Sequence, residues 1–217
     1  MNDKQRNKKT DGYSLLELML TMTIMLIVLG LATSLFSKSL GVKQRESSRT
    51  DALTAAQAAL NVMSREISNA GYGLKNSAAT DASNGIVLAD SNNQKLHFLS
   101  NIQNNNTATT DRDENITYFF DNATQSILRY DANANGVGSP ETSIIINRIS
   151  SVNYLYFDYT GSSSTPTQSN TPSENTGRVR VTITVNLENV QGQTNGQSVV
   201  LTSDITLRNS NYMLNQY

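Results

Sequence analysis

The sequence has no cysteine, one histidine and only three prolines among its 217 residues. Without cysteine the chain can form no disulfide scaffold, no thiolate zinc site and no cysteine nucleophile. The lone histidine, His97, excludes a multi-histidine metal site, and we expect it to face solvent from a strand rather than to act as a general base. No glycine pattern typical of a nucleophile elbow surrounds a serine. These absences argue against an enzyme.

Charge of either sign is also sparse. The formal net charge is −1 and the isoelectric point about 5.8, so a nucleic-acid partner is not expected. Mean hydropathy is −0.39 although much of the apolar content lies near the N-terminus. The rest of the chain is rich in Asn, Ser and Thr, a composition typical of exported domains with many turns.

One long hydrophobic run is present, from Leu15 to Phe36, and its only charged residue is Glu17. Twenty-two helical residues extend roughly 33 Å, enough to cross a hydrocarbon core of about 30 Å. A basic flank precedes the run and favours a cytoplasmic N-terminus. That flank contains Lys4, Arg6, Lys8 and Lys9 against Asp3 and Asp11.

The helical pattern continues beyond the hydrophobic run. An apolar residue recurs every three or four positions, as on one face of an amphipathic helix, at Leu53, Ala56, Leu60, Met63, Ile67 and Ala70. No proline interrupts residues 1–139, and Gly71 and Gly73 provide a stop signal. We therefore expect one helix over residues 14–70, which leaves a membrane and then packs one face on a domain.

Residues 74–217 alternate between strand-like runs and polar turns and predict an antiparallel β domain. The expected strands are residues 85–89, 95–100, 115–121, 126–130, 143–149, 152–160, 178–188 and 198–208. Residues 178–187 alternate strictly, residues 118–130 indicate a hairpin, and residues 161–177 predict a flexible low-complexity loop with Pro166 and Pro172.

Gly12-Tyr13-Ser14-Leu15-Leu16-Glu17, between a short basic leader and the apolar run, resembles the class III signal of type IV prepilins and pseudopilins. The resemblance implies that a prepilin peptidase removes residues 1–12, cutting between Gly12 and Tyr13, and methylates the Tyr13 amine. Most of the family has phenylalanine at that position. Residues 13–36 would then cross the membrane, and residues 37–73 would form the amphipathic half of the helix. The alternative is a plain signal anchor, or a secretory signal cut near Ala32-Thr33-Ser34.

A carboxylate such as Glu17 inside a membrane costs on the order of 2.5–3.5 kcal/mol and should find a partner. Cleavage after Gly12 would create an α-amine four residues away along the chain. In a staggered stack of such helices the amine of one subunit can meet Glu17 of a neighbour, and the pair would fix the axial register.

Further segments resemble the helix end and strands of PilW-type minor pilins and, next, of the J-type pseudopilins of type II secretion: residues 64–73, 116–130, 152–159, 178–185 and 205–209. The resemblance implies an α+β pilin-like fold, with a long transmembrane and amphipathic helix packed on a C-terminal antiparallel β-sheet domain. It implies a subunit of the priming or tip complex of a type IV pilus. An adhesin or DNA-uptake module on a pilin stem is the second class of function.

The expected location is the inner membrane, with a single pass, a cytoplasmic N-terminus and an exported β domain, followed by the pilus or cell surface. The expected partners are other minor and major pilins, the prepilin peptidase and the inner-membrane assembly platform.

Two further patterns carry weaker signals. Asp131, Asn133 and Asn135, followed by Gly136, match the first half of a calcium loop, but Thr142 stands at the closing position and Glu141 falls one place short. An Asn- and Gly-rich turn is the simpler interpretation, and the acidic turn at residues 111–114 is a second candidate for a ligand source. The tyrosines of residues 154–159 suggest a stacking surface, although the spacing of Tyr154 and Tyr156 more simply places both on one face of a strand.

Overall fold

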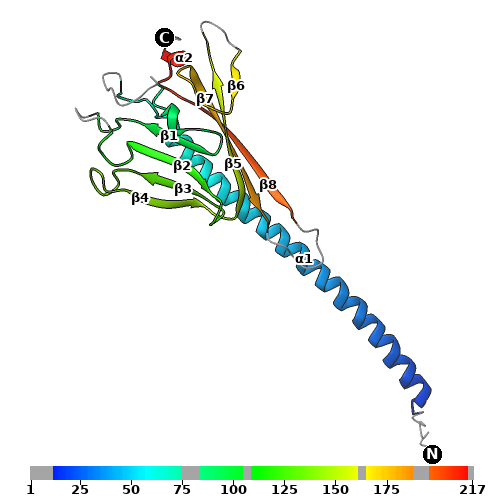
Figure 1. The fold of residues 1–217 in the computed structure, drawn as a ribbon. Coiled ribbons are helices and arrows are strands. Elements are labelled where there is room, and N and C mark those ends of the chain that lie inside the picture. The colour runs from blue at the N-terminus through cyan, green and yellow to red at the C-terminus, as the bar shows by residue number, and fades with distance from the viewer. Residues whose placement is uncertain (1–11, 75–83, 105–108, 161–164, 188–195, 215–217) are drawn as a thin grey trace, which may run out of the picture.

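The computed structural model describes residues 12–74, 84–104, 109–160, 165–187 and 196–214 (Figure 1). A single 53-residue helix, α1 (Leu15–Ile67), begins after the extended Ser14. Gly71 and Gly73, with φ of 78° and 68°, turn the chain away after the helix, as their place in the sequence predicts. The helix is thus slightly shorter than the expected range of residues 14–70.

Two four-stranded antiparallel sheets follow the helix, which confirms the α+β arrangement of a long helix packed on antiparallel sheets. The first sheet has the order β1-β2-β3-β4 and the second the order β6-β5-β7-β8. The strands of the first sheet are β1 (Lys95–Leu99), β2 (Asn115–Asp121), β3 (Ser126–Asp131) and β4 (Glu141–Ile146). Those of the second are β5 (Ile149–Asp158), β6 (Thr167–Ser169), β7 (Thr176–Asn186) and β8 (Ser198–Thr206).

The core lies where the C-terminal half of α1 meets the inner faces of both sheets, while the N-terminal half projects away from them (Figure 1). The buried helix residues are Ala56, Ala59, Leu60, Met63 and Ile67. Strand β7 buries every second residue, as its alternating sequence predicts. Leu53 is the exception to the predicted stripe, because it is 37% exposed and Ala52 packs against the core in its place.

Several strand predictions need correction. Residues 85–89 form no strand beyond a single bridge between Ile86 and Phe98, because Gly85 has a φ of 79° and η1, a 3₁₀ turn (Leu88–Asp90), follows. Strand β4 ends at Ile146 rather than at residue 149, since Arg148 adopts a φ of 59° that breaks the strand before β5. The short strand β6 lies inside the expected loop of residues 161–177 and pairs with β5.

Two local predictions differ in outcome. The hairpin of residues 118–130 is confirmed: Asp121 pairs with Ser126, and the Asp121 carboxylate accepts hydrogen bonds from the Ala123 amide at 3.0 Å and the Thr124 hydroxyl at 2.6 Å. The short helix α2 (Asn211–Leu214) was not expected from the sequence. The ring of Tyr212 in α2 stacks on the ring of Tyr159, which follows β5, with the ring centroids 3.8 Å apart.

Candidate functional site

The Gly12–Tyr13 peptide bond lies in exposed, non-helical backbone. Tyr13 is 86% exposed, and nothing lies within 4 Å of the position that a Cβ on Gly12 would take. The helix starts only at Leu15, so no helical hydrogen bond has to break before a protease can bind this peptide in an extended form. The predicted cleavage at this bond stays a prediction, and residues 1–11 of the leader lie outside the described residues.

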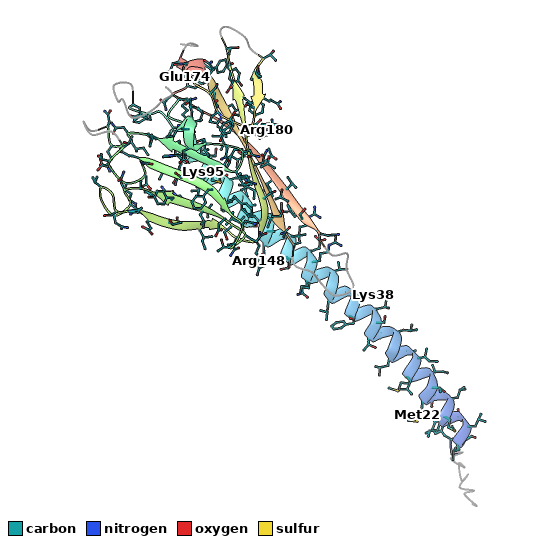
Figure 2. The ribbon with its side chains drawn as sticks, in the orientation of Figure 1. Met22, Lys38, Lys95, Arg148, Glu174 and Arg180 are labelled. Carbon is teal, nitrogen blue, oxygen red and sulfur yellow. The ribbon has the colours of Figure 1, made fainter. Side chains whose placement is uncertain are left out.

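The N-terminal half of α1 is apolar on all sides. Large apolar side chains between Leu15 and Phe36 are more than half exposed, and the helix is long and apolar enough to cross a membrane (Figure 2). Its threonines place no unsatisfied hydroxyl in that environment. Thr21, Thr23 and Thr33 donate to helix carbonyl oxygens one turn earlier, at 2.9, 2.7 and 2.6 Å.

Glu17 is different from these threonines. Its carboxylate has no hydrogen-bond or ion-pair partner among the described residues, and it is the only ionisable side chain between Tyr13 and Lys38. It lies in the first turn of α1, where the helix dipole favours a negative charge only weakly. Within a membrane this carboxylate therefore needs a partner from outside the described chain.

Glu66, near the other end of α1, accepts two hydrogen bonds from the first sheet. The Tyr118 hydroxyl donates to its Oε2 at 2.6 Å, and Arg129 Nε donates to the same atom at 3.0 Å. Arg129 also donates to Asp113 Oδ1 at 2.5 Å and lies 3.5 Å from Asp131 Oδ2. This cluster of Glu66, Arg129, Tyr118, Asp113 and Asp131, here called the anchor cluster, joins the helix to strands β2 and β3.

Burial and charge shift the pKa values of two members of the anchor cluster. Burial raises the pKa of the Tyr118 hydroxyl well above its usual value, and the adjacent Glu66 carboxylate raises it further. Burial alone would lower the pKa of Arg129, but the Glu66 and Asp113 carboxylates together outweigh burial and the net shift is upward. Tyr118 therefore stays a neutral donor and Arg129 a cation across the physiological range.

In the candidate calcium loop, the side chains of Asp131 and Asn133 form hydrogen bonds with backbone groups. Asp131 is 1% exposed and accepts from the amides of Asp113 at 3.0 Å and Asn133 at 3.1 Å. The Asn133 side chain donates to the Thr109 carbonyl at 2.8 Å and accepts from the Gly138 amide at 3.0 Å. Asn135 bonds through its amide to the Ser139 carbonyl.

The acidic turn of residues 111–114 does lie beside this loop, and Glu114 is fully buried, with amide hydrogen bonds from Gln103 and Asp111. Within the described residues no group of three or more His, Cys, Asp or Glu side chains is arranged to hold a metal ion. The side-chain oxygens of Asp131 and Asn133, two of the three predicted ligands, thus already accept backbone hydrogen bonds.

His97 lies on the outer face of β1, as expected, but its side chain is only 18% exposed. Its Nδ1 is 2.9 Å from Asp90 Oδ2 and its Nε2 is 2.9 Å from Asn115 Oδ1. His97 thus faces outward from its strand, and the turn that carries Asp90 covers part of its ring. Tyr154 and Tyr156 do share one face of β5, but that face is the core, and both are 0% exposed.

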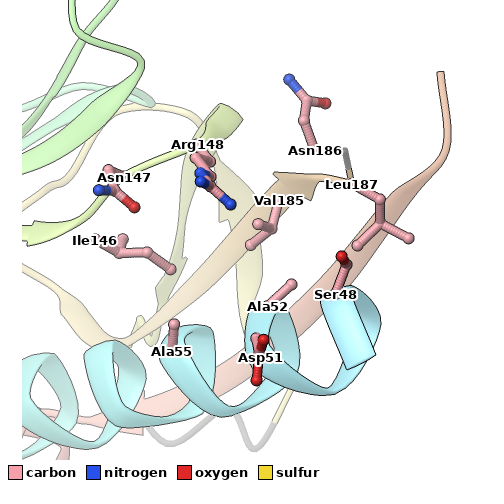
Figure 3. A pocket seen from close by; sticks show the side chains of 10 residues that line it. All are labelled: Ser48, Asp51, Ala52, Ala55, Ile146, Asn147, Arg148, Val185, Asn186 and Leu187. Atoms are coloured by element: carbon pink, nitrogen blue, oxygen red, sulfur yellow. The ribbon is translucent and has the colours of Figure 1, made fainter. Parts of the chain in front are cut away.

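A groove opens where α1 leaves the β domain (Figure 3). It has a volume of about 360 Å³, with Ala52 and Ala55 on the helix side and Ile146, Arg148 and Val185 on the sheet side. Asp51 stands beside it on the helix. The small alanines leave this space between helix and sheets.

The sequence predictions missed the anchor cluster. The sequence signals for it were a glutamate next to the apolar stripe of the helix, between Met63 and Ile67, and the family-like segments of residues 64–73 and 116–130. The partners of this glutamate stand 52 and 63 positions away, on strands whose pairing cannot be read from periodicity.

Residues 7–33 match a family described as the prokaryotic N-terminal methylation motif. No curated protein and no solved structure matches the chain. The matched segment contains Gly12, Tyr13, Glu17 and most of the apolar run, the residues that the resemblance singled out. Together with the exposed apolar half of α1 and its packing on antiparallel sheets, the motif supports a type IV pilin-like, membrane-anchored protein.

Proposed function

We propose that the chain is a minor pilin of the PilW type, a structural and assembly subunit of the priming or tip complex of a type IV pilus. In this proposal the prepilin peptidase cuts between Gly12 and Tyr13 and methylates the new amine of Tyr13. The methylation motif and the exposed, extended backbone at this bond support the step. The mature subunit stays anchored in the inner membrane, with its β domain exported, until the assembly platform adds it to other pilins.

The observation that carries the proposal is the Glu17 carboxylate, which no described residue pairs with, in the otherwise apolar N-terminal half of α1. Cleavage would place a positively charged amine four residues before it, within about 6 Å along a helix axis. Pairing that amine with Glu17 of an adjacent subunit satisfies both charges and fixes how far one helix slides along the next. Nothing in an ordinary membrane anchor needs such a pair.

The anchor cluster supports the resemblance to the PilW-type and J-type proteins as a group. Two segments that resemble PilW-type proteins, residues 64–73 and 116–130, meet in space through Glu66, Tyr118 and Arg129. Because these two separate family-like segments contact each other in the fold, their resemblances are less easily explained as independent chance matches. The J-type pseudopilins share the same segments and form the second candidate.

The test compares Glu17→Val with Thr21→Val, one turn further along the same helix. The Thr21 hydroxyl is already satisfied by the Leu18 carbonyl, so its loss leaves no charge unpaired. Glu17→Val leaves the amine of a neighbour unpaired in the assembled helices, a loss on the order of 3–5 kcal/mol per contact. We expect Glu17→Val to be processed and inserted normally but to be depleted from sheared filaments, whereas Thr21→Val enters filaments like the wild type. Wild-type amounts of Glu17→Val in filaments would contradict the proposal.

A further inference from the structure

The outer face of the first sheet has a hollow at its centre, and the strand register explains it. Thr117 on β2 stands between His97 on β1 and Tyr130 on β3, its direct cross-strand partners. In the next row on the same face, Phe119 pairs with Lys95 and Leu128. A small side chain surrounded by larger ones leaves a depression with a volume of about 630 Å³, within the range of about 300–1,000 Å³ for small-molecule sites.

One wall of the hollow is held in place by a hydrogen-bonded group. Asp90 accepts from Lys95 Nζ at 2.5 Å and contacts His97 Nδ1 at 2.9 Å, and the other ring nitrogen of His97 contacts Asn115. Burial by itself would raise the pKa of Asp90, but the hydrogen bonds and charges of Lys95 and His97 outweigh it and lower that pKa. The Asp90 carboxylate and the Lys95 ammonium thus neutralise each other within this wall.

Three polar groups of the hollow have no hydrogen-bond partner among the described residues. Thr117 is only 5% exposed, yet no described residue hydrogen-bonds to its hydroxyl. Among the described residues, the Asn115 amide nitrogen and the Tyr130 hydroxyl also have none, and all three residues line the hollow. A hydroxyl without a protein partner at the floor of a hollow is a group that a bound ligand can satisfy.

The aromatic residues Phe119 and Tyr130 also line the hollow. Neutral donors and acceptors at the floor, next to aromatic side chains, suit a ligand that has both hydroxyl groups and apolar C–H faces. We propose that the hollow between Thr117, Phe119 and Tyr130 binds one ring of a neutral saccharide. Its hydroxyls would bond to Thr117 and Asn115, and its C–H face would lie against an aromatic ring. This inference is independent of the proposed assembly role.

The test is saturation-transfer NMR on the full chain in an amine-oxide detergent, because maltoside and glucoside detergents would themselves supply sugar. The probes are the methyl glycosides of glucose, galactose and mannose, N-acetylglucosamine, and the neutral polysaccharide dextran. Glucuronic acid and glucosamine serve as an anion and a cation of similar shape. We expect transfer to the ring protons of at least one neutral sugar and weaker transfer to the charged ones. Transfer to dextran as well would indicate that a polysaccharide is accepted, and its absence would indicate a free sugar.

The variants are Thr117→Val, which removes only the hydroxyl, and Phe119→Leu, which removes a ring. Thr142→Val is the matched control, because Thr142 lies opposite Tyr130 on the same face but outside the hollow and is exposed. Thr117→Val should weaken binding about tenfold and Thr142→Val should not. Should Thr117→Val melt early, Tyr130→Phe provides the same test of a lost hydroxyl. The inference fails if no neutral sugar receives saturation, if the charged sugars receive as much, or if both hydroxyl variants bind like the wild type.

Discussion

Removing Arg129 tests how the membrane helix is fastened to the β domain. The Arg129 side chain is 12% exposed, and it is the cation shared by Glu66, Asp113 and Asp131. Arg129→Met keeps much of the length and the apolar stem of the side chain but leaves Glu66 and Asp131 without their cation, while Asp113 keeps Arg112 at 3.8 Å. One of them, Asp131, has a side chain only 1% exposed. Removing one partner of such a buried pair costs about 3–5 kcal/mol.

Arg180→Met is the matched control on the other sheet. Arg180 donates to both oxygens of Asp204, at 2.6 and 2.8 Å. The hydrogen-bond geometry of this pair is thus at least as good as that of Arg129 with its carboxylates. The difference is exposure, because the side chains of Arg180 and Asp204 are 37% and 36% exposed. A pair in contact with water contributes roughly 0.2–1 kcal/mol. The two variants should therefore differ by about 3 kcal/mol in the free energy of unfolding.

The assay is equilibrium unfolding in urea, followed by the near-ultraviolet circular dichroism of the tyrosines. The chain has no tryptophan, and the buried Tyr118, Tyr154 and Tyr156 belong to the β domain, so the signal reports this domain. A cycle with Glu66→Gln then isolates the contact to the helix. If Arg129→Met costs no more than Arg180→Met, the anchor cluster does not fasten the helix as described.

Two further predictions concern backbone and pH. Gly85→Ala would place the new Cβ 2.0 Å from the Gly71 amide nitrogen, whereas Gly138, with a similar positive φ, has open space around it. Thermal unfolding should therefore show a loss of about 1 kcal/mol for Gly138→Ala and a further 1–3 kcal/mol or more for Gly85→Ala, and equal losses would contradict the close approach. The hydrogen bond from Arg180 lowers the pKa of Asp204 below the unfolded-state value of 3.8. The Asp204 carboxylate therefore stabilises the fold fully above pH 3.8, and this stabilisation is lost as the pH falls through the lower pKa of the folded state. Melting temperatures across this acid range should fall less steeply for Asp204→Asn than for the wild type, and parallel curves would contradict the assignment.

Periodicity was sufficient to predict the helix and several strands. The apolar run and the stripe that follows it share one helical repeat, so α1 was expected to within three residues at its C-terminal end. Strand β2 agrees with its expected bounds, since polar turns delimit it on both sides. In each case the local sequence and the tertiary environment favour the same conformation.

The parts that could not be predicted depend on contacts between distant residues. Gly85 looked like the start of a strand, but its backbone passes against Gly71 and takes a positive φ. His97 looked exposed because its burial comes from Asp90, on a turn that periodicity does not place. Thr117 gave no signal at all, because its position at the floor of a hollow depends on the register of three strands. Local patterns specify elements, but not which side chains those elements bring together.

Mass spectrometry of the N-terminus of the membrane-bound protein tests the central claim most directly. The proposal requires a mature chain that begins at Tyr13, carries one methyl group on its amine and retains Glu17 as its fifth residue. Gly12→Ala gives no steric change, because the space around Gly12 is open, so a block of processing in that variant would reflect recognition by the peptidase. A chain that begins at Tyr13 with an N-methyl group is the predicted result. An intact Met1, or a new N-terminus near Ser34, would contradict it.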